Sequence, residues 1–485
     1  MKLNISFVKF RKLHRQKQNQ AVSFSQSCKN YNFVENLYKF ILVKKNSFIF
    51  ESVEKGVIRG RYTIIGYNPD ISYNIQNNKI IVDNFKKKKV IKKDVLKYLN
   101  ELLENFRVKS PGNIPKMSSM LVGYFSYDII RLIEKIPDKC KNDINIPDIR
   151  LMRPKNLIIY DNLQKKIFFV YNVFKDEKIE NYKFKYESIK NLFKELQHFG
   201  NIRLPENFHK NNKKIKIKSN ISKNKFKKIV LKAKNYIKKG DIFQVVLSQR
   251  FEASIDKPPL EIYNTLRVLN PSPFMFYFNY NDFQILGSSP EILVRSLNGD
   301  VTVRPIAGTR PRGKNKKQDK KFTLELLKDP KELAEHLMLL DLGRNDVGKV
   351  SKKNTVRVTE RFKVEKYSHV MHIVSNVTGK LKRNLSLFET FLSGFPAGTV
   401  SGAPKIRAME IIDELENTKR KLYAGGIGYF TSNQDFDTCI ALRTALIKSK
   451  KIYVQSGAGI VADSNPKNEY NETVNKAKAL LKAIN

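Results

Sequence analysis

Hydrophobic and polar positions follow different patterns in the two halves of the chain. The first half holds short apolar runs broken by Asn, Lys and Gly, such as residues 117–130 and 166–174, which predict strands joined by polar loops. Residues 175–228 are lysine-rich, with helical spacing near 180–197 and a polar stretch at 206–224. We interpret that polar stretch as a linker between two regions.

From about residue 225, predicted helices and strands are mixed irregularly. Apolar residues at helical spacing and a terminal Gly240 predict a helix over 226–240. Further helices are predicted over about 319–342, 404–416 and 466–484, with strand-like runs between them. This mixture favours an α+β fold with mainly antiparallel sheets over a wound parallel sheet.

Size and composition indicate a globular protein. The chain has 485 residues, of which 41% are hydrophobic, so it can bury a large core. No run approaches the roughly 18 apolar residues of a membrane-spanning helix. Residues 1–20 are basic but lack the apolar core of a secretory signal, so we interpret them as a frayed N-terminal extension, with a transit peptide as the minor alternative.

The cysteines and the charge narrow the class of function. Cys28, Cys140 and Cys439 are odd in number and widely spaced, which indicates neither a disulfide framework nor a zinc site and favours a cytoplasmic location. The net charge of +45 comes from lysines scattered through every segment. A nucleic-acid-binding protein normally clusters its charge on one element, so we expect no nucleic-acid partner.

Paired glutamates are the first candidate for chemistry. Glu332 and Glu335 are three residues apart in a predicted helix and therefore share one face, and Glu469 and Glu472 repeat that spacing. Carboxylate oxygens of this kind suit Mg²⁺. Two solvated helix faces would give the same spacing, so the pairs alone leave both interpretations open.

Glycine-rich segments and a few cationic residues are the second candidate. The segments are RPIAGTRPRG (304–313), FPAGTVSGAPK (395–405) and VQSGAGIV (454–461), and glycines let a backbone expose N–H donors to an anion. Arg443 lies in an otherwise apolar run, where it would serve either an internal ion pair or a substrate carboxylate. His369 and His372 would face opposite sides of a strand.

Together, these motifs resemble the chorismate-binding enzymes. The resemblance rests on PIAGTRPRG, KELAEHLMLLDLGRNDVG, VEKYSHVMHIVSNVTG, FPAGTVSGAPKIRAMEIID, YAGGIGYF, DTCIALRTA, VQSGAGIVADS and EYNET, from about residue 225 to 480. It implies an α/β/β/α sandwich of two mainly antiparallel sheets with outer helices. The N-terminal segment FIFESVEKGVIRGRYTIIGYNP resembles the first region of anthranilate synthase component I, which implies a regulatory region over 21–205 and a catalytic region over 225–485.

Two positions indicate the branch of the family. Aminodeoxychorismate synthases carry a nucleophilic lysine where this chain has Ala307, and isochorismate and salicylate synthases carry a lysine that activates water where this chain has Gln244. With neither lysine present, an external nucleophile such as ammonia is implied. The resemblance therefore favours an anthranilate synthase large subunit, with aminodeoxychorismate synthase component I as the alternative.

The resemblance also implies roles for individual residues. Mg²⁺ would be held by Glu335 and Glu472, with Glu332 and Glu469 in support. His372 would be the acid for the departing hydroxyl, and Thr399 would lie near the pyruvyl group. The expected chorismate ligands are Gly308, Thr309, Tyr423, Arg443, Gly457, Ala458 and Gly459.

Regulation and assembly are the last expectations from the resemblance. A tryptophan site would form between two segments, and its expected residues are Glu51, Ser52, Pro273, Phe274 and Met275. The chain contains no recognisable glutaminase. It is therefore expected to take ammonia from a separate glutamine amidotransferase subunit (component II), in a heterotetramer of two large and two small subunits.

Overall fold

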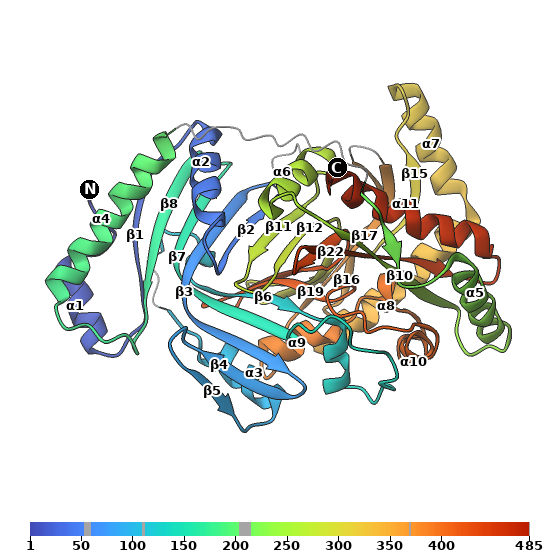
Figure 1. The fold of residues 1–485 in the computed structure, drawn as a ribbon, viewed down its shortest axis with the longest axis horizontal. Coiled ribbons are helices and arrows are strands. Elements are labelled where there is room, and N and C mark those ends of the chain that lie inside the picture. Colours follow the sequence, from blue (N-terminus) through green and yellow to red (C-terminus); the bar gives the residue numbers. More distant parts are fainter. Residues whose placement is uncertain (53–59, 109–111, 203–214, 368–369, 485) are drawn as a thin grey trace.

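The structure is a computed structural model that describes residues 1–484 apart from 53–59, 109–111, 203–214 and 368–369. Helices lie outside and strands fill the interior (Figure 1). The helices are α1 (Phe7–Arg15), α2 (Tyr31–Leu42), α3 (Val95–Asn105), α4 (Tyr182–Asn201), α5 (Lys223–Lys238), α6 (Pro259–Leu269), α7 (Lys316–Lys328), α8 (Pro330–Val350), α9 (Leu387–Ser393), α10 (Lys405–Leu415) and α11 (Pro466–Ile484), with 3₁₀ turns η1 (Lys116–Ser118), η2 (Tyr127–Leu132) and η3 (Gly398–Val400).

The strands form a continuous hydrogen-bonded network in which the named strands pair antiparallel. They are β1 (Gln20–Ser27), β2 (Ser47–Glu51), β3 (Tyr62–Gln76), β4 (Lys79–Asp83), β5 (Lys88–Ile91), β6 (Met120–Phe125), β7 (Ile149–Asp161), β8 (Lys166–Val173), β9 (Lys218–Ser219), β10 (Gln244–Ser254), β11 (Phe274–Asn279), β12 (Gln284–Ser289), β13 (Ile292–Leu297), β14 (Asp300–Val303), β15 (Ile306–Pro311), β16 (Arg357–Lys366), β17 (Val370–Lys380), β18 (Gly402–Ala403), β19 (Gly426–Thr431), β20 (Phe436–Ile440), β21 (Thr444–Lys448) and β22 (Lys451–Ile460).

Two sheets share the long strands β3 and β7. The first sheet runs β1-β8-β7-β3-β2-β11-β12-β21-β22-β10. The second leaves β7 and runs β6-β19-β20-β13-β14-β17, where β17 is flanked by β15 and β16. Strands from before and after the predicted linker therefore pair directly, as β2 does with β11 and β6 with β19.

Successive side chains of the first sheet point to opposite faces and therefore contribute to two separate cores. Phe48, Phe276 and Ile285 face the second sheet and belong to the larger core. Their neighbours Ile49 and Tyr277 face the other way, into a core beneath the outer helices. Because successive strand residues point to opposite faces, this central sheet is apolar on both sides. The predicted fold class, an α+β sandwich of two mainly antiparallel sheets with outer helices, is confirmed.

Local predictions hold in several places. The helix predicted over 226–240 is α5, and Gly240 follows it at φ +82°, a left-handed conformation that favours glycine. The helices predicted near 404–416 and over 466–484 are α10 and α11. The run 166–174 contains β8, whereas only the middle of 117–130 forms a strand, β6.

Two local predictions were wrong. The single helix expected over 319–342 is two helices, because Pro330 starts α8 and the residue before a proline leaves the α region. Asp329 caps the new helix by accepting hydrogen bonds from the N–H groups of Lys331 and Glu332. The N-terminus is not frayed either, because α1 packs on α4 and Phe10 is fully buried against Tyr182 and Tyr186.

The remaining part of the domain prediction is not decided. Residues 206–214 of the predicted linker lie outside the described residues, and Lys218–Ser219 already pairs with β10. The division into a regulatory region over 21–205 and a catalytic region over 225–485 stays a prediction.

Candidate active site

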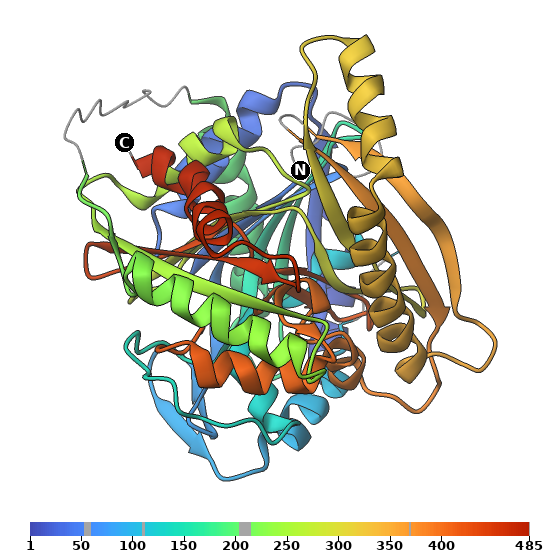
Figure 2. The same ribbon diagram turned by 90° about the vertical axis from the view of Figure 1, so that its right-hand side faces the viewer.

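The paired glutamates lie in the first two turns of α8 and α11. Figure 2 views the face where α11, α5 and α10 lie over β10 with α8 beside them. Burial raises the pKa of Glu335, and the nearby charges of Glu332 and Glu472 raise this pKa further. Burial and then the charge of Glu472 raise the pKa of Glu469. Since carboxylates shift one another only at short range, the two helices bring their negative charges together.

Two basic side chains balance these carboxylates. The Lys476 Nζ lies 2.7 Å from Glu472 Oε1 and donates to the Gly457 carbonyl at 3.2 Å. The charge of Lys476 opposes the rise in the pKa of Glu335 and of Glu469 but does not cancel it. Arg310 pairs with Glu332 at 2.8 Å. Within the described part of the chain, no three acidic, His or Cys side chains already converge as a metal-ligand cluster.

The glutamates nevertheless fit a magnesium ion. Their oxygens are the hard ligands that Mg²⁺ prefers, and one or two carboxylates with waters and substrate oxygens complete its shell. Glu335 accepts a hydrogen bond from Gln244 Nε2 at 3.1 Å, and Glu472 would exchange Lys476 for the metal. A cation entering here would offset the burial and the repulsion that together raise the pKa of Glu335.

The glycine-rich segments border the same groups. Gly308 has φ +68°, a left-handed conformation that favours glycine, and a Cβ added there would crowd Glu332 Oε2 at 3.1 Å. Gly457 and Gly459 lie on one face of β22, beside the Tyr423 hydroxyl and the Gln244 amide respectively. Ala458 between them is fully buried in the core beneath α5 and α10, so only its backbone can face a ligand.

His372 lies at the centre of this group. Its Nδ1 is 2.9 Å from the Gly308 carbonyl and 3.1 Å from Thr309 Oγ1. Because a carbonyl can only accept, Nδ1 carries the proton and Nε2 keeps its lone pair. Burial lowers the pKa of His372 to about 4, opposed by the Gly308 hydrogen bond and reinforced by the charges of Arg443 and Lys476. In this state His372 is neutral at pH 7, which disfavours its expected role as an acid; that role stays a prediction.

Arg443 resolves one alternative that the sequence left open. It is partly buried, sits at φ +46°, and burial lowers its pKa. No acidic side chain of the described residues forms an ion pair with it, so the internal salt bridge is absent from that part of the chain. A desolvated guanidinium near His372 that lacks an anion is suited to bind a substrate carboxylate. His369 lies outside the described residues.

Glu291 is a candidate residue that the sequence analysis missed. Its side chain follows Pro290, is 5% exposed, and borders a cavity of about 20 Å³ that Thr399 also lines. Burial raises the pKa of Glu291 to about 8, and polar interactions with Thr399 and the Ile306 backbone oppose that rise. This carboxyl therefore carries a proton at neutral pH. A lone acid inside the apolar run FQILGSSPEILV was the signal that could have identified it.

The residues of the predicted tryptophan site also lie together. Strand pairing places Met275 opposite Glu51, and Pro273 and Phe274 directly precede Met275. The Glu51 carboxylate accepts hydrogen bonds from Tyr31, Tyr263 and Arg267 at 2.6–3.0 Å, so it serves the internal network. The buried Ser52 Oγ has no hydrogen-bond partner among the described residues.

Known proteins resemble this chain over nearly its whole length. The family model described as chorismate binding enzyme matches residues 45–482. Anthranilate synthase component 1 of Cereibacter sphaeroides is 43% identical over 99% of this chain and 97% of its own length. The chain belongs to the chorismate-binding enzyme family.

Further relatives agree with this assignment. Anthranilate synthase component 1 of Acetivibrio thermocellus is 45% identical over 93% of this chain and 92% of its own. The crystal structure of anthranilate synthase component I from Streptococcus pneumoniae matches with a TM-score of 0.78 and 38% identity, over 88% of this chain and 94% of that one. Membership of this enzyme family identifies the chain as an enzyme that acts on chorismate.

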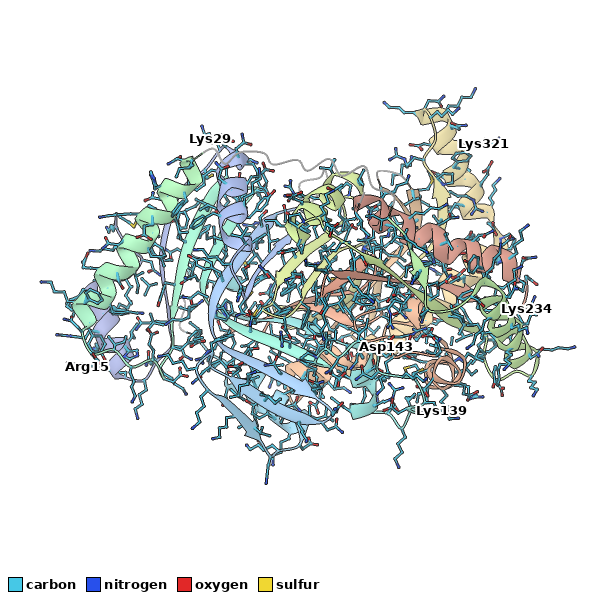
Figure 3. All side chains as sticks on the ribbon, in the orientation of Figure 1. Arg15, Lys29, Lys139, Asp143, Lys234 and Lys321 are labelled. Carbon is cyan, nitrogen blue, oxygen red and sulfur yellow. The ribbon has the colours of Figure 1, made fainter. Side chains whose placement is uncertain are left out.

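Basic side chains are spread over the surface of the molecule. Figure 3 shows Lys29, Lys139, Lys234 and Lys321 on widely separated parts of the molecule, as expected from lysines scattered along the sequence. The three cysteines are free. Among the described helices, none combines the length and apolar character needed to cross a membrane.

Proposed function

We propose that this enzyme converts chorismate and ammonia into anthranilate, pyruvate and water, the first step of tryptophan biosynthesis. The observation that carries the proposal is the similarity to anthranilate synthase component 1 over nearly the whole of both chains. The side chains at the two branch positions agree with it. Ala307 has only a methyl group, and the Gln244 amide is bonded to Glu335, so neither can act as nucleophile or base.

The carboxylates of α8 and α11 are the proposed magnesium site. Glu335 and Glu472 would hold the ion, with Glu332 and Glu469 in support. When bound, Mg²⁺ would supply charge stabilisation and a template for the ring carboxylate, an effect worth several kcal/mol. Arg310 and Lys476 act as counter-charges that keep these glutamates compatible with the fold without the metal.

Chorismate would lie between the glycine-rich segments. The Arg443 guanidinium is proposed to bind a carboxylate bidentately, and Tyr423 and Thr309 to contact the substrate through their hydroxyls. The backbones of Gly308 and 457–459 can approach the ring closely because Gly308, Gly457 and Gly459 have no side chain. Tyr423 and Gly457 are buried and Arg443 is partly buried, so this part of the site is shielded from water.

Proton transfer is the step for which the structure suggests two groups. The 4-hydroxyl must leave with a proton, and Glu291 carries one at neutral pH because burial raises its pKa to about 8. His372 is neutral, and its unprotonated Nε2 can accept a hydrogen bond from the substrate or the added ammonia. We therefore propose Glu291, which lines the same small cavity as Thr399, as the acid in preference to His372.

The proposal includes a source of ammonia and an inhibitor. The name component 1 of the relatives supports a further component. That partner is proposed to be an amidotransferase that delivers ammonia from glutamine, in a heterotetramer of two copies of each chain. Tryptophan is proposed to inhibit by binding at Ser52, Pro273, Phe274 and Met275, where the Ser52 Oγ has no hydrogen-bond partner among the described residues. Free cysteines support a reducing, cytoplasmic setting.

A single assay tests the reaction. Purified protein is given chorismate, Mg²⁺ and an ammonium salt at mildly alkaline pH, and anthranilate is followed by fluorescence while pyruvate is measured with lactate dehydrogenase. Equal amounts of both products are expected. Aminodeoxychorismate without pyruvate would favour the aminodeoxychorismate synthase alternative, and absence of turnover would refute the proposal.

A further inference from the structure

Arg420 connects several segments that carry the proposed chorismate site. It lies between α10 and β19, and its side chain is 2% exposed. Its Nε and Nη2 atoms bond both carboxylate oxygens of Glu416, at 3.0 and 2.6 Å. The same guanidinium donates to the Val400 carbonyl at 2.7 Å and the Val246 carbonyl at 2.6 Å. One planar group therefore fixes the η3 turn, strand β10 and the end of α10 at once.

The Arg420 guanidinium also contacts two aromatic rings near the proposed site. The Arg420 guanidinium carbon lies 4.9 Å from the Tyr127 ring centre and 5.4 Å from that of Tyr423. Cation–π contact of a desolvated arginine fixes the orientation of an aromatic ring. The Tyr423 hydroxyl then reaches Gly457, where an added Cβ would lie 2.5 Å from it. Tilting this ring would move the hydroxyl in the chorismate site.

A second layer keeps the arginine in place. Glu416 Oε1 also accepts hydrogen bonds from the backbone N–H and the hydroxyl of Ser248, both at 2.8 Å. The Ser248 hydroxyl in turn accepts from Gln455 Nε2 at 2.8 Å, on the strand that leads to Gly457. A buried hydrogen-bond network of this kind is rigid, because each broken bond leaves an unpaired polar group.

We propose that Arg420, locked by Glu416, is the positioning residue that sets the relative placement of Thr399, Tyr423 and the start of β10 around chorismate. The inference rests on the proposed location of chorismate between these segments. Arg420 itself contacts no proposed metal ligand. Its effect on the reaction is therefore transmitted through the Val400 carbonyl, the Val246 carbonyl and the Tyr423 ring.

The test is Arg420→Lys, which keeps the charge but cannot make the planar set of bonds. With saturating ammonium and Mg²⁺, kcat/KM for chorismate is expected to fall about 100-fold with a raised KM, since a displacement of about 1 Å has that cost. Arg153→Lys is the matched control, because Arg153 also bonds a carboxylate through two nitrogens, Asp70 at 2.9 and 2.6 Å, and lies 3.9 Å from the Phe174 ring centre, but contacts no proposed site segment. Arg153→Lys is expected to lower the melting temperature and leave KM unchanged.

The outcomes separate the two proposals. If the unmodified enzyme makes no anthranilate, the proposed function fails and the Arg420 assignment fails with it. If it does, but folded Arg420→Lys keeps KM within about twofold and loses kcat only in proportion to its folded fraction, the positioning role is overturned. Should Arg420→Lys not fold, Glu416→Gln tests the same step, with about a tenfold rise in KM expected and an unchanged KM overturning the role.

Discussion

Replacing Glu291 with glutamine tests the buried acid in two independent ways. In the folded protein burial raises the pKa of Glu291 from its ordinary 4.5 to about 8. Glutamine has the same size and does not titrate. At about 1.4 kcal/mol for each unit of pKa, the ionised carboxyl costs the fold at most about 5 kcal/mol.

The sign of the pH dependence follows from proton linkage. Between pH 4.5 and 8 the folded protein holds a proton on Glu291 that the unfolded chain releases. The stability linked to that proton is therefore fully present below pH 4.5 and is lost as the pH rises through about 8. Because Glu291→Gln has no such loss, its unfolding free energy relative to the unmodified protein should increase with pH.

Urea unfolding at about pH 5, 7 and 9 measures this difference. Glu291→Gln should gain on the unmodified protein by a few kcal/mol between the lowest and highest pH. Glu325→Gln is the control, because Glu325 is 46% exposed on α7 and forms only a loose pair with Lys321 at 3.9 Å. Parallel stability profiles for Glu291→Gln and the unmodified protein would refute the raised pKa.

The same variant tests catalysis. At a constant concentration of neutral ammonia, kcat/KM of the unmodified enzyme should fall above about pH 8, as Glu291 loses its proton. Glu291→Gln should lower kcat at least about 100-fold, since it cannot protonate the leaving hydroxyl. If Glu291→Gln keeps a normal kcat and shows the expected stability profile, Glu291 is buried and protonated but is not the acid of the reaction.

Three further substitutions test other parts of the structure. Glu335→Gln should lower kcat at least about 1000-fold with an unchanged melting temperature, because an amide is a poor magnesium ligand; a normal Mg²⁺ titration would contradict the metal assignment. Ser52→Phe should raise the tryptophan concentration for half-inhibition more than about tenfold, with the uninhibited rate retained; unaltered inhibition would exclude this site. Gly343→Ala should stabilise α8 by about 1 kcal/mol, since its Cβ would meet Pro305 and Val303 at 3.7 Å without a clash. Gly348→Ala, where nothing lies within 4 Å, is its control, and a lower melting temperature for Gly343→Ala alone would contradict the packing argument.

Periodicity along the chain predicted the elements that have strong local signals. The helices α5, α10 and α11 follow from apolar spacing and their ends from glycine and proline. The break at Pro330 was missed because the apolar pattern continues across it. The order of Ser6–Arg15 was missed because its burial depends on Tyr182 and Tyr186, far along the chain.

The site shows the same division between local and long-range information. Spacing alone placed Glu332 and Glu335 on one helix face, and the resemblance supplied their partners on α11. The protonation states could not be read from the sequence. His372 is neutral and Glu291 protonated because of burial and neighbours, and those arise only when β13, β15 and β17 assemble.

The pairing of β2 with β11 and of β6 with β19 has a consequence for any attempt to divide the protein. A cut within the predicted linker at 206–224 would not release two independent domains. Each fragment would expose the strand edges that its counterpart normally covers, and would be prone to aggregate. Co-expressed fragments, in contrast, should reassemble into one active particle, so the two halves can be complemented in trans but not studied apart.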